Sequence, residues 1–297
     1  MHRFVIDTHI HLFDPRRPQG IPWPTKDDVA IYHPALPDRY KGVTQGAGIV
    51  GAIAVECSPW LEDNQWVLDI VAHNPVILGT VGNLEPGKPH FAENLEHFHK
   101  DPLFLGIRCG NLWGRNLAEQ ISNPDFVADI KLLARAGLAM DTANPDARLI
   151  SASLKLKDMV PELRIVVDHL PQFEPPDAAT RAAVRADLRE LASRPQVFAK
   201  ISEVLRKVSG RVPKDLSFYL GKLDDLWNIF GEDRVLYGSD WPNSDIWAPY
   251  ANVFGVIQEY AEGKTPEARD KLFWKNSLAA YRWLPRETSQ AHAVAGA

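Results

Sequence analysis

Cysteine and long apolar runs are both scarce in this sequence. Only two cysteines, Cys57 and Cys109, occur in 297 residues, too few for the disulfide framework of a small secreted domain. Each follows an apolar, strand-like stretch, so we expect free thiols in a reducing cytoplasm. No apolar run approaches the roughly 20 residues that a transmembrane helix needs, and residues 1–3 lead directly into a strand-like stretch instead of a signal peptide. The sequence therefore predicts a cytoplasmic protein without a membrane partner.

The chain also lacks any dense run of basic residues. Its formal net charge is -5 at pH 7, which argues against nucleic acid as the main partner and gives no attraction to an anionic membrane surface. Proline and tryptophan, by contrast, are plentiful, with 23 and 9 residues. Proline favours ordered loops, and tryptophan suits the walls of a ligand-binding cleft.

Short apolar segments alternate with amphipathic segments along the whole chain. This alternation is typical of a (β/α)8 TIM barrel, an α/β fold whose active site lies at the carboxyl ends of its strands. A doubly wound sheet is excluded because no Gly-rich phosphate loop follows the first strand. We therefore expect one barrel domain over residues 1–287, with extra C-terminal helices at 249–262 and 266–283, and a disordered tail over 288–297. The expected strands cover residues 4–11, 49–56, 76–82, 103–108, 138–141, 164–169, 196–201 and 234–240.

A long segment rich in proline and tryptophan follows the first strand. It covers residues 14–44, shows no clean periodicity and contains Trp23 and Tyr32. Irregular segments of this length in a compact chain are usually functional or disordered. The aromatic residues favour a packed cover over the active site.

The first strand ends with two histidines, His9 and His11, one residue apart. Side chains alternate along a strand, so both imidazoles are expected to point the same way. Two convergent imidazoles suit a metal ion, or a carbonyl oxygen held between two donors.

The other expected strands also end in polar residues. At the shared carboxyl edge of a barrel, such residues favour a hydrolytic active site. They are Glu56, Asn83, Arg108, Asp141, His169, Lys200 and Asp240.

Most of these residues also have a structural explanation. Glu56 and Asn83 could be solvated loop residues, Arg108 and Lys200 partners of nearby acids, and His169 a hydrogen-bonded core histidine. A structural explanation is weakest for Asp240, because a buried carboxylate needs a partner or a function.

Several motifs together resemble the amidohydrolase superfamily, and its amidohydrolase-2 branch in particular. They are Asp-Thr-His-Ile-His-Leu-Phe-Asp-Pro at 7–15, Gly-Ile-Arg ending at Arg108, Val-Asp-His-Leu around His169, and Gly-Ser-Asp-Trp-Pro around Asp240. The branch contains fucono- and rhamnonolactonases, 2-pyrone-4,6-dicarboxylate lactonase and 4-sulfomuconolactone hydrolase. The resemblance implies a TIM-barrel hydrolase that opens a lactone ring.

The resemblance also implies roles for individual residues. Asp240 would be the general base and His169 a second catalytic residue, with one divalent metal (zinc or manganese) or none. The fifth strand ends in Asp141 where metal-dependent members of the superfamily usually carry a histidine or modified lysine, so both alternatives stay open. Candidate metal ligands are His9, His11, Glu56 and His169; candidate substrate-binding residues are Arg108, Asn83, Asn111, Trp113, Asp141, Lys200 and Trp241.

The leading hypothesis is hydrolysis of a sugar-acid or related carboxylated lactone in carbohydrate catabolism. Water deprotonated by Asp240 would attack the ring carbonyl. The alternatives are a metal-dependent decarboxylase of the same superfamily, a lactone isomerase, and a barrel that only binds its ligand. Terminal helices and exposed aromatic residues are compatible with a homodimer.

Overall fold

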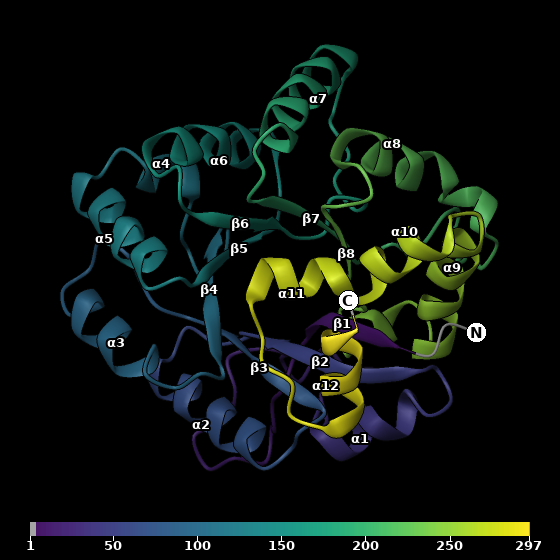
Figure 1. The fold of residues 1–297 in the computed structure, drawn as a ribbon, viewed down its shortest axis with the longest axis horizontal. Coiled ribbons are helices and arrows are strands. Elements are labelled where there is room, and N and C mark those ends of the chain that lie inside the picture. Colours follow the sequence, from purple (N-terminus) through teal and green to yellow (C-terminus); the bar gives the residue numbers. More distant parts are fainter. Residues whose placement is uncertain (1–3, 297) are drawn as a thin grey trace.

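The computed structural model describes residues 4–296, so residues 1–3 and Ala297, the last residue of the expected tail, lie outside the described residues. Eight parallel strands follow one another around a single sheet in chain order, with helices on the outside (Figure 1). The strands are β1 (Val5–Ile10), β2 (Ile49–Val55), β3 (Ile77–Gly82), β4 (Phe104–Gly110), β5 (Ala139–Ala143), β6 (Arg164–Val167), β7 (Val197–Ile201) and β8 (Val235–Tyr237).

Backbone hydrogen bonds just beyond β8 join the last strand to the first. The amide of Asp240 donates to the His9 carbonyl at 2.8 Å, and the amide of His11 donates to the Trp241 carbonyl at 2.7 Å. The predicted (β/α)8 barrel is confirmed.

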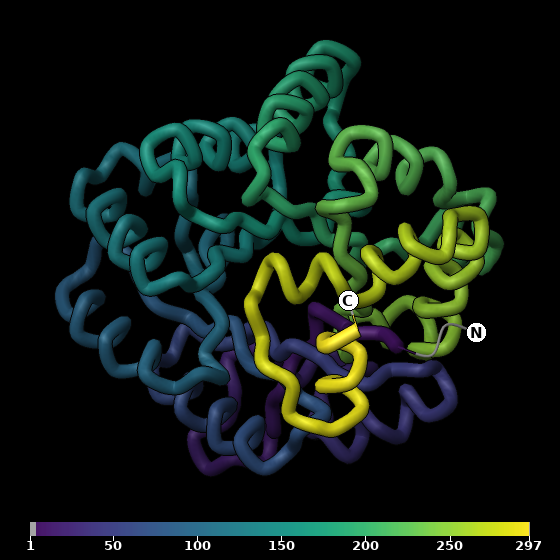
Figure 2. The backbone as a smooth tube through the Cα atoms, viewed as in Figure 1, coloured from purple at the N-terminus to yellow at the C-terminus, as the bar shows by residue number. Residues whose placement is uncertain are grey.

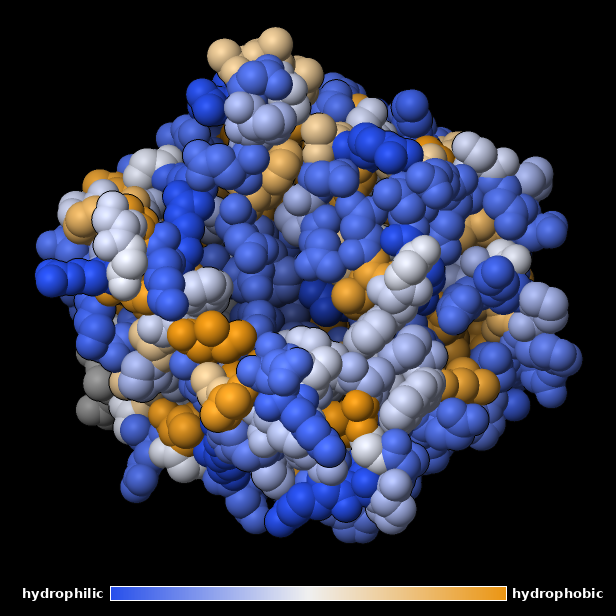
Figure 3. All heavy atoms as spheres, turned by 180° about the vertical axis from the view of Figure 1, so that it is seen from behind, coloured by the Kyte–Doolittle hydropathy of each residue, from blue (hydrophilic) through white to orange (hydrophobic). Residues whose placement is uncertain are grey.

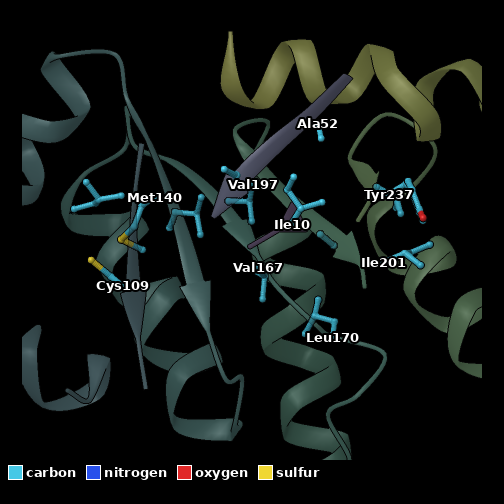
Figure 4. Packing of buried hydrophobic residues seen from close by; sticks show 14 of the residues in the cluster. Ile10, Ala52, Cys109, Met140, Val167, Leu170, Val197, Ile201 and Tyr237 are labelled. Atoms are coloured by element: carbon cyan, nitrogen blue, oxygen red, sulfur yellow. The ribbon is translucent and has the colours of Figure 1, made fainter. Parts of the chain in front are cut away.

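Helices alternate with the strands and cover the outer surface of the barrel. Apolar side chains of the strands, among them Ile10, Met140 and Val167, pack beneath these helices (Figure 4). In the part of the chain that the structure describes, no helix combines the length and apolar character needed to cross a membrane. The helices are α1 (Pro37–Val43), α2 (Leu61–Ala72), α3 (Phe91–Phe98), α4 (Leu117–Gln120), α5 (Pro124–Arg135), α6 (Ala147–Met159), α7 (Ala178–Ala192), α8 (Leu220–Phe230), α9 (Tyr250–Glu262), α10 (Pro266–Asp270), α11 (Asn276–Tyr281) and α12 (Thr288–Ala295).

Alternation along the strands places a polar layer above an apolar one inside the barrel. Val166 and Phe198 belong to the inner apolar cluster, and two residues further along the chain the same face carries Asp168, just beyond β6, and Lys200 in β7. Gly238 leaves the room this layer needs, because a Cβ there would lie 2.7 Å from the Cβ of His9.

The C-terminal segment closes the amino-terminal end of the barrel. Figure 2 shows the yellow chain crossing in front of the strands, and Arg164, the first residue of β6, donates to the Ala280 carbonyl of α11 at 2.7 Å. The face on the other side carries a hollow with hydrophilic residues around it (Figure 3).

Two expectations need correction. The segment 14–44 is not irregular throughout, since it ends in α1, where Pro37 lies in the first turn and fixes a helical φ. The expected disordered tail forms α12, because a capping box between Glu287 and Gln290 satisfies its first backbone N–H groups. Gln290 is fully buried and donates to the Val50 carbonyl at 2.8 Å.

Candidate active site

A cavity of about 250 Å³ opens among the loops that follow the carboxyl ends of the strands. This is the end of a TIM barrel at which catalytic residues gather. The described residues that line it are His11, Trp23, Glu56, Cys57, Arg108, Leu112, Trp113, Asn144, His169, Glu203, Asp240 and Asn243. Both cysteines are free thiols, as expected.

Five successive strands, β4 to β8, are each followed by a cavity-lining residue in the left-handed backbone region. Non-glycine residues adopt this conformation uncommonly, and such strain of roughly 1–3 kcal/mol per residue gathers at functional sites. The residues and their φ angles are Trp113 at 57°, Asn144 at 51°, His169 at 56°, Glu203 at 50° and Asp240 at 60°.

The carboxyl group of Asp240 lies at the centre of the polar contacts. Its Oδ1 is 3.1 Å from Nε2 of His11 and 3.5 Å from Nε2 of His9, and its Oδ2 accepts a hydrogen bond from the Asn243 amide at 2.7 Å. Burial raises the pKa of Asp240 to about 7, against the opposing effect of Asn243 and Arg108. A buried carboxyl with a pKa near neutrality is suited to act as a general base.

His11 presents a lone pair to this carboxyl group. Its Nδ1 lies 2.9 Å from the Val55 carbonyl, which can only accept, so the ring proton of neutral His11 is on Nδ1 and Nε2 is free. Burial and the charge of Arg108 lower the pKa of His11 to about 4. The proton in the contact between His11 and Asp240 therefore belongs to Asp240 when that carboxyl is protonated.

Lys200 fixes the opposite tautomer of His9. Its ammonium group contacts Asp141 Oδ2 at 2.8 Å, Asp168 Oδ1 at 2.9 Å and His9 Nδ1 at 3.1 Å. An ammonium group only donates, so Nδ1 of His9 accepts and its ring proton is on Nε2, facing Asp240. Burial, followed by the charge of Lys200, holds the pKa of His9 well below its usual value. The carboxylates outweigh burial at Lys200 itself and raise its pKa.

His169 is held between Arg108 and Ser202. The Arg108 guanidinium donates to His169 Nε2 at 3.0 Å, so the ring proton is on Nδ1, which donates to Ser202 Oγ at 2.8 Å. Arg108 also pairs with Asp168, its Nε lying 3.3 Å from Oδ2. Burial is the main reason that the pKa of His169 is well below its usual value.

Glu203, which is not among the polar strand-end residues predicted from the sequence, supplies a second carboxyl group. Its Oε1 accepts from the same Asn243 amide at 2.9 Å, and its Oε2 lies 3.9 Å from His169 Nδ1. Burial and the nearby charge of Asp240 raise the pKa of Glu203 to about 9, so it is neutral at pH 7. The sequence position of Glu203 could have indicated this, because Glu203 lies two residues after Ile201, the last residue of β7.

Glu56 is fixed by donors from two loops. Its Oε2 accepts from Trp113 Nε1 and from the Ser58 amide, each at 3.0 Å. Its Oε1 is buried and has no hydrogen-bond partner. The segment expected to cover the site contributes one of its two aromatic residues. Trp23 packs edge-on against His11, with ring centroids 5.4 Å apart. Tyr32 is not among the described residues that line the cavity.

The structure separates several predicted substrate-binding residues from the cavity. Asp141 and Lys200 are fully buried below it, because β5 runs on to Ala143 and leaves Asp141 in mid-strand. Trp241 is also fully buried and packs against Tyr40, with ring centroids 5.3 Å apart. These three residues do not line the cavity, and a role for them in binding a substrate stays a prediction.

Two predicted asparagines also lie elsewhere. Asn83 lines a different cavity, of about 280 Å³, beside Lys88 and Asn94. The side-chain amide of Asn111 donates to the Asn144 backbone carbonyl at 3.1 Å, and the side-chain amide of Asn144 donates to the Asn111 backbone carbonyl at 2.8 Å. Asn111 is not among the described residues that line the cavity of about 250 Å³.

Two clusters of described residues have the spacing of a metal site, their ligand atoms lying within 4.8 Å of one another. Neither includes the expected ligands His11 and Glu56. The clusters are His9, His169 and Asp240, and His9, Asp141 and Asp168.

The histidine lone pairs of these clusters are, however, already engaged. Nδ1 of His9 accepts from Lys200 and Nε2 of His169 accepts from Arg108, so neither histidine of these clusters offers a free ligand atom. Protein zinc sites use three or four ligands. The donor set therefore does not fit a divalent cation while Lys200 and Arg108 hold their present contacts.

Comparison with known proteins agrees with the fold. The chain is 27% identical over 302 residues to the L-fucono-1,5-lactonase of Burkholderia ambifaria, covering 98% of this chain and 99% of that protein. It is 26% identical over 290 residues to the L-fucono-1,5-lactonase of Burkholderia multivorans, covering 94% and 96%. A solved amidohydrolase from Burkholderia multivorans with bound zinc superimposes with a TM-score of 0.80 at 21% identity, covering 95% of this chain and all of that one (100%).

The amidohydrolase family model matches residues 6–283, almost the whole described barrel. This range includes His9 of β1 and His11 just beyond it, the Arg108 strand and the Asp240 loop. The chain belongs to the amidohydrolase family.

Proposed function

We propose that this protein hydrolyses a neutral, polyhydroxylated lactone, with Asp240 as the general base. The observation that carries the proposal is the position of Asp240, whose buried carboxyl lies 3.1 Å from the free lone pair of His11 and opens onto the same cavity as Arg108. The two fuconolactonases, aligned over nearly the whole chain, support the reaction class.

In this mechanism a water molecule held by Asp240 attacks the ring carbonyl and gives its proton to that carboxylate. The N–H groups of Arg108 that do not contact Asp168 or His169 stabilise the oxyanion. The bond between the carbonyl carbon and the ring oxygen then breaks, and Asp240 returns the proton to the ring oxygen. The product is an open hydroxy acid.

The charge of the cavity favours a neutral substrate over a dicarboxylate. Arg108 is the one lysine or arginine among the described lining residues, and its charge is already matched by Asp168. Glu56 and Asp240 add acidic groups, and Glu203 adds a neutral carboxyl group. A dianionic lactone would face these acids without a free cation to pair with, whereas Trp23 and Trp113 offer flat walls to a sugar-like ring.

Acid release from a panel of lactones tests the proposal. L-Fucono-1,5-lactone and related aldonolactones should release acid, and 2-pyrone-4,6-dicarboxylate should react at least tenfold more slowly. Carbon dioxide release from aromatic acids would favour the decarboxylase alternative, and a new lactone without acid release would favour the isomerase.

We further propose that the reaction needs no metal ion, because Lys200 and Arg108 occupy the histidine lone pairs that a metal would use. Enzyme dialysed against a chelator should keep its rate on the best lactone within about twofold, and added zinc should not raise it. Loss of the rate with recovery on adding zinc or manganese would show that these contacts rearrange around a cation.

A further inference from the structure

Glu56 lines the cavity at the carboxyl ends of the strands and carries an unpaired oxygen. Its residue is 6% exposed, and Oε1 is buried without a hydrogen-bond partner, while Oε2 accepts two hydrogen bonds. Buried polar atoms are nearly always paired, so an exception at a ligand cavity calls for a donor supplied by the ligand.

The carboxyl group cannot easily turn to find another partner. Its Oε2 is held at 3.0 Å by the indole N–H of Trp113 from the β4 loop and at 3.0 Å by the amide of Ser58. Trp113 itself is set by a left-handed backbone, with φ at 57°. Donors from the β2 and β4 loops thus fix the direction of Oε1.

The residues that line the cavity indicate which group of a ligand would donate to Oε1. Glu56 lines this cavity together with Trp113 and Trp23. A ring hydroxyl supplies a donor beside a C–H face, which matches an acceptor beside an aromatic wall. A carboxylate on the ligand would instead place two like charges together.

We propose that Glu56 selects hydroxylated lactones by accepting a hydrogen bond from a ring hydroxyl at Oε1, with Trp113 positioning its carboxyl group. This inference rests on the proposed lactone hydrolysis and adds a specificity-determining residue to it. A site built to bind a hydroxyl discriminates strongly against the analogue that lacks it.

The test compares two lactones that share one ring. L-Fucono-1,5-lactone carries hydroxyls, and δ-hexalactone has the same six-membered ring and methyl group without them. In Glu56→Gln the side-chain carbonyl can still accept from Trp113 and Ser58, while an amide N–H replaces Oε1. This variant should lose ten- to a hundredfold in kcat/KM on L-fucono-1,5-lactone, mainly through KM, and stay within about twofold on δ-hexalactone.

Two further variants keep the test decisive. Trp113→Phe retains an aromatic wall but removes the donor to Oε2, and it should show the same selective loss at a smaller size. Glu96→Gln, an exposed carboxylate on α3 that pairs with Lys100 on the surface, is the matched control and should change neither substrate.

Equal loss on both lactones, or no loss on either, would overturn the role of Glu56 while leaving lactone hydrolysis in place. If the unmutated protein opens neither lactone, the proposed function fails and this inference falls with it. Unchanged thermal unfolding of Glu56→Gln separates a loss of recognition from a loss of folding.

Discussion

The pKa of Asp240 should determine how kcat/KM depends on pH. Burial raises that pKa to about 7, and the base is active only when ionised. The value of kcat/KM should therefore increase about tenfold per pH unit up to about pH 7 and level off above it. A profile that is flat between pH 5.5 and 8.5 would contradict this assignment.

Ionisation of Glu203 in the folded protein should lower its stability at high pH. Its pKa is raised from 4.5 to about 9 in the folded protein, so folding takes up a proton between these values. The contribution of Glu203 to stability is full below pH 4.5 and is lost as the pH rises toward 9. Glu203→Gln should therefore raise the thermal midpoint by a few degrees at pH 8 and by much less at pH 4.5. A variant less stable than the original protein at both pH values would show that Glu203 holds the loop in place.

At the scale of residues, the sequence predicts the direction of a side chain better than its depth in the barrel. The spacing of His9 and His11 predicts that both face one point, and both reach Asp240. Asp141 looked like a rim residue because β5 was expected to end there, but the strand continues to Ala143. Strand boundaries depend on pairing with neighbours, which periodicity does not report.

At the scale of elements, α12 should stabilise the barrel from the end opposite the active site. Gln290 accepts from the amides of Arg286 and Glu287 at 2.7 and 3.1 Å and donates to Val50. Gln290→Ala would leave these buried groups unpaired, at a cost of about 1–3 kcal/mol. Thermal unfolding should shift down by several degrees with kcat unchanged, whereas exposed Ser289→Ala should have little effect. An unchanged thermal midpoint in Gln290→Ala would mean that α12 does not stabilise the barrel.

The sequence predicts the β-strands and the longer helices, but not α1, α4 or α12. These three helices are short, and α12 depends on a contact with a distant segment, the Val50 carbonyl. Short helices are marginal on their own. Pairing of Phe13 with Ala35 likewise orders part of the proline-rich segment through a contact that local pattern does not contain.

At the scale of the whole molecule, Lys200 joins four strands through the barrel interior. Its ammonium group links His9 of β1, Asp141 of β5 and Asp168 beyond β6 to β7 itself. Lys200→Met would leave buried Asp141 without its cation and Asp168 with Arg108 alone, and breaking such a buried pair costs about 3–5 kcal/mol. Urea unfolding should show this loss.

The matched control for Lys200 is Lys100→Met, which breaks an exposed pair with Glu96. Such surface pairs contribute about 0–1 kcal/mol. If the two variants unfold at the same urea concentration, Lys200 does not hold the barrel together.

The most direct test of the account is the rate of acid release by Asp240→Asn on the best lactone. Loss of a general base typically costs at least 100-fold, so the variant should lose that much in kcat and still unfold cooperatively. Asp245→Asn is the control, because Asp245 lies outside the cavity and pairs with Arg39 at 2.7 Å; it should retain normal turnover. An Asp240→Asn protein that keeps more than about a tenth of the rate would contradict the role of Asp240 and with it the proposed mechanism.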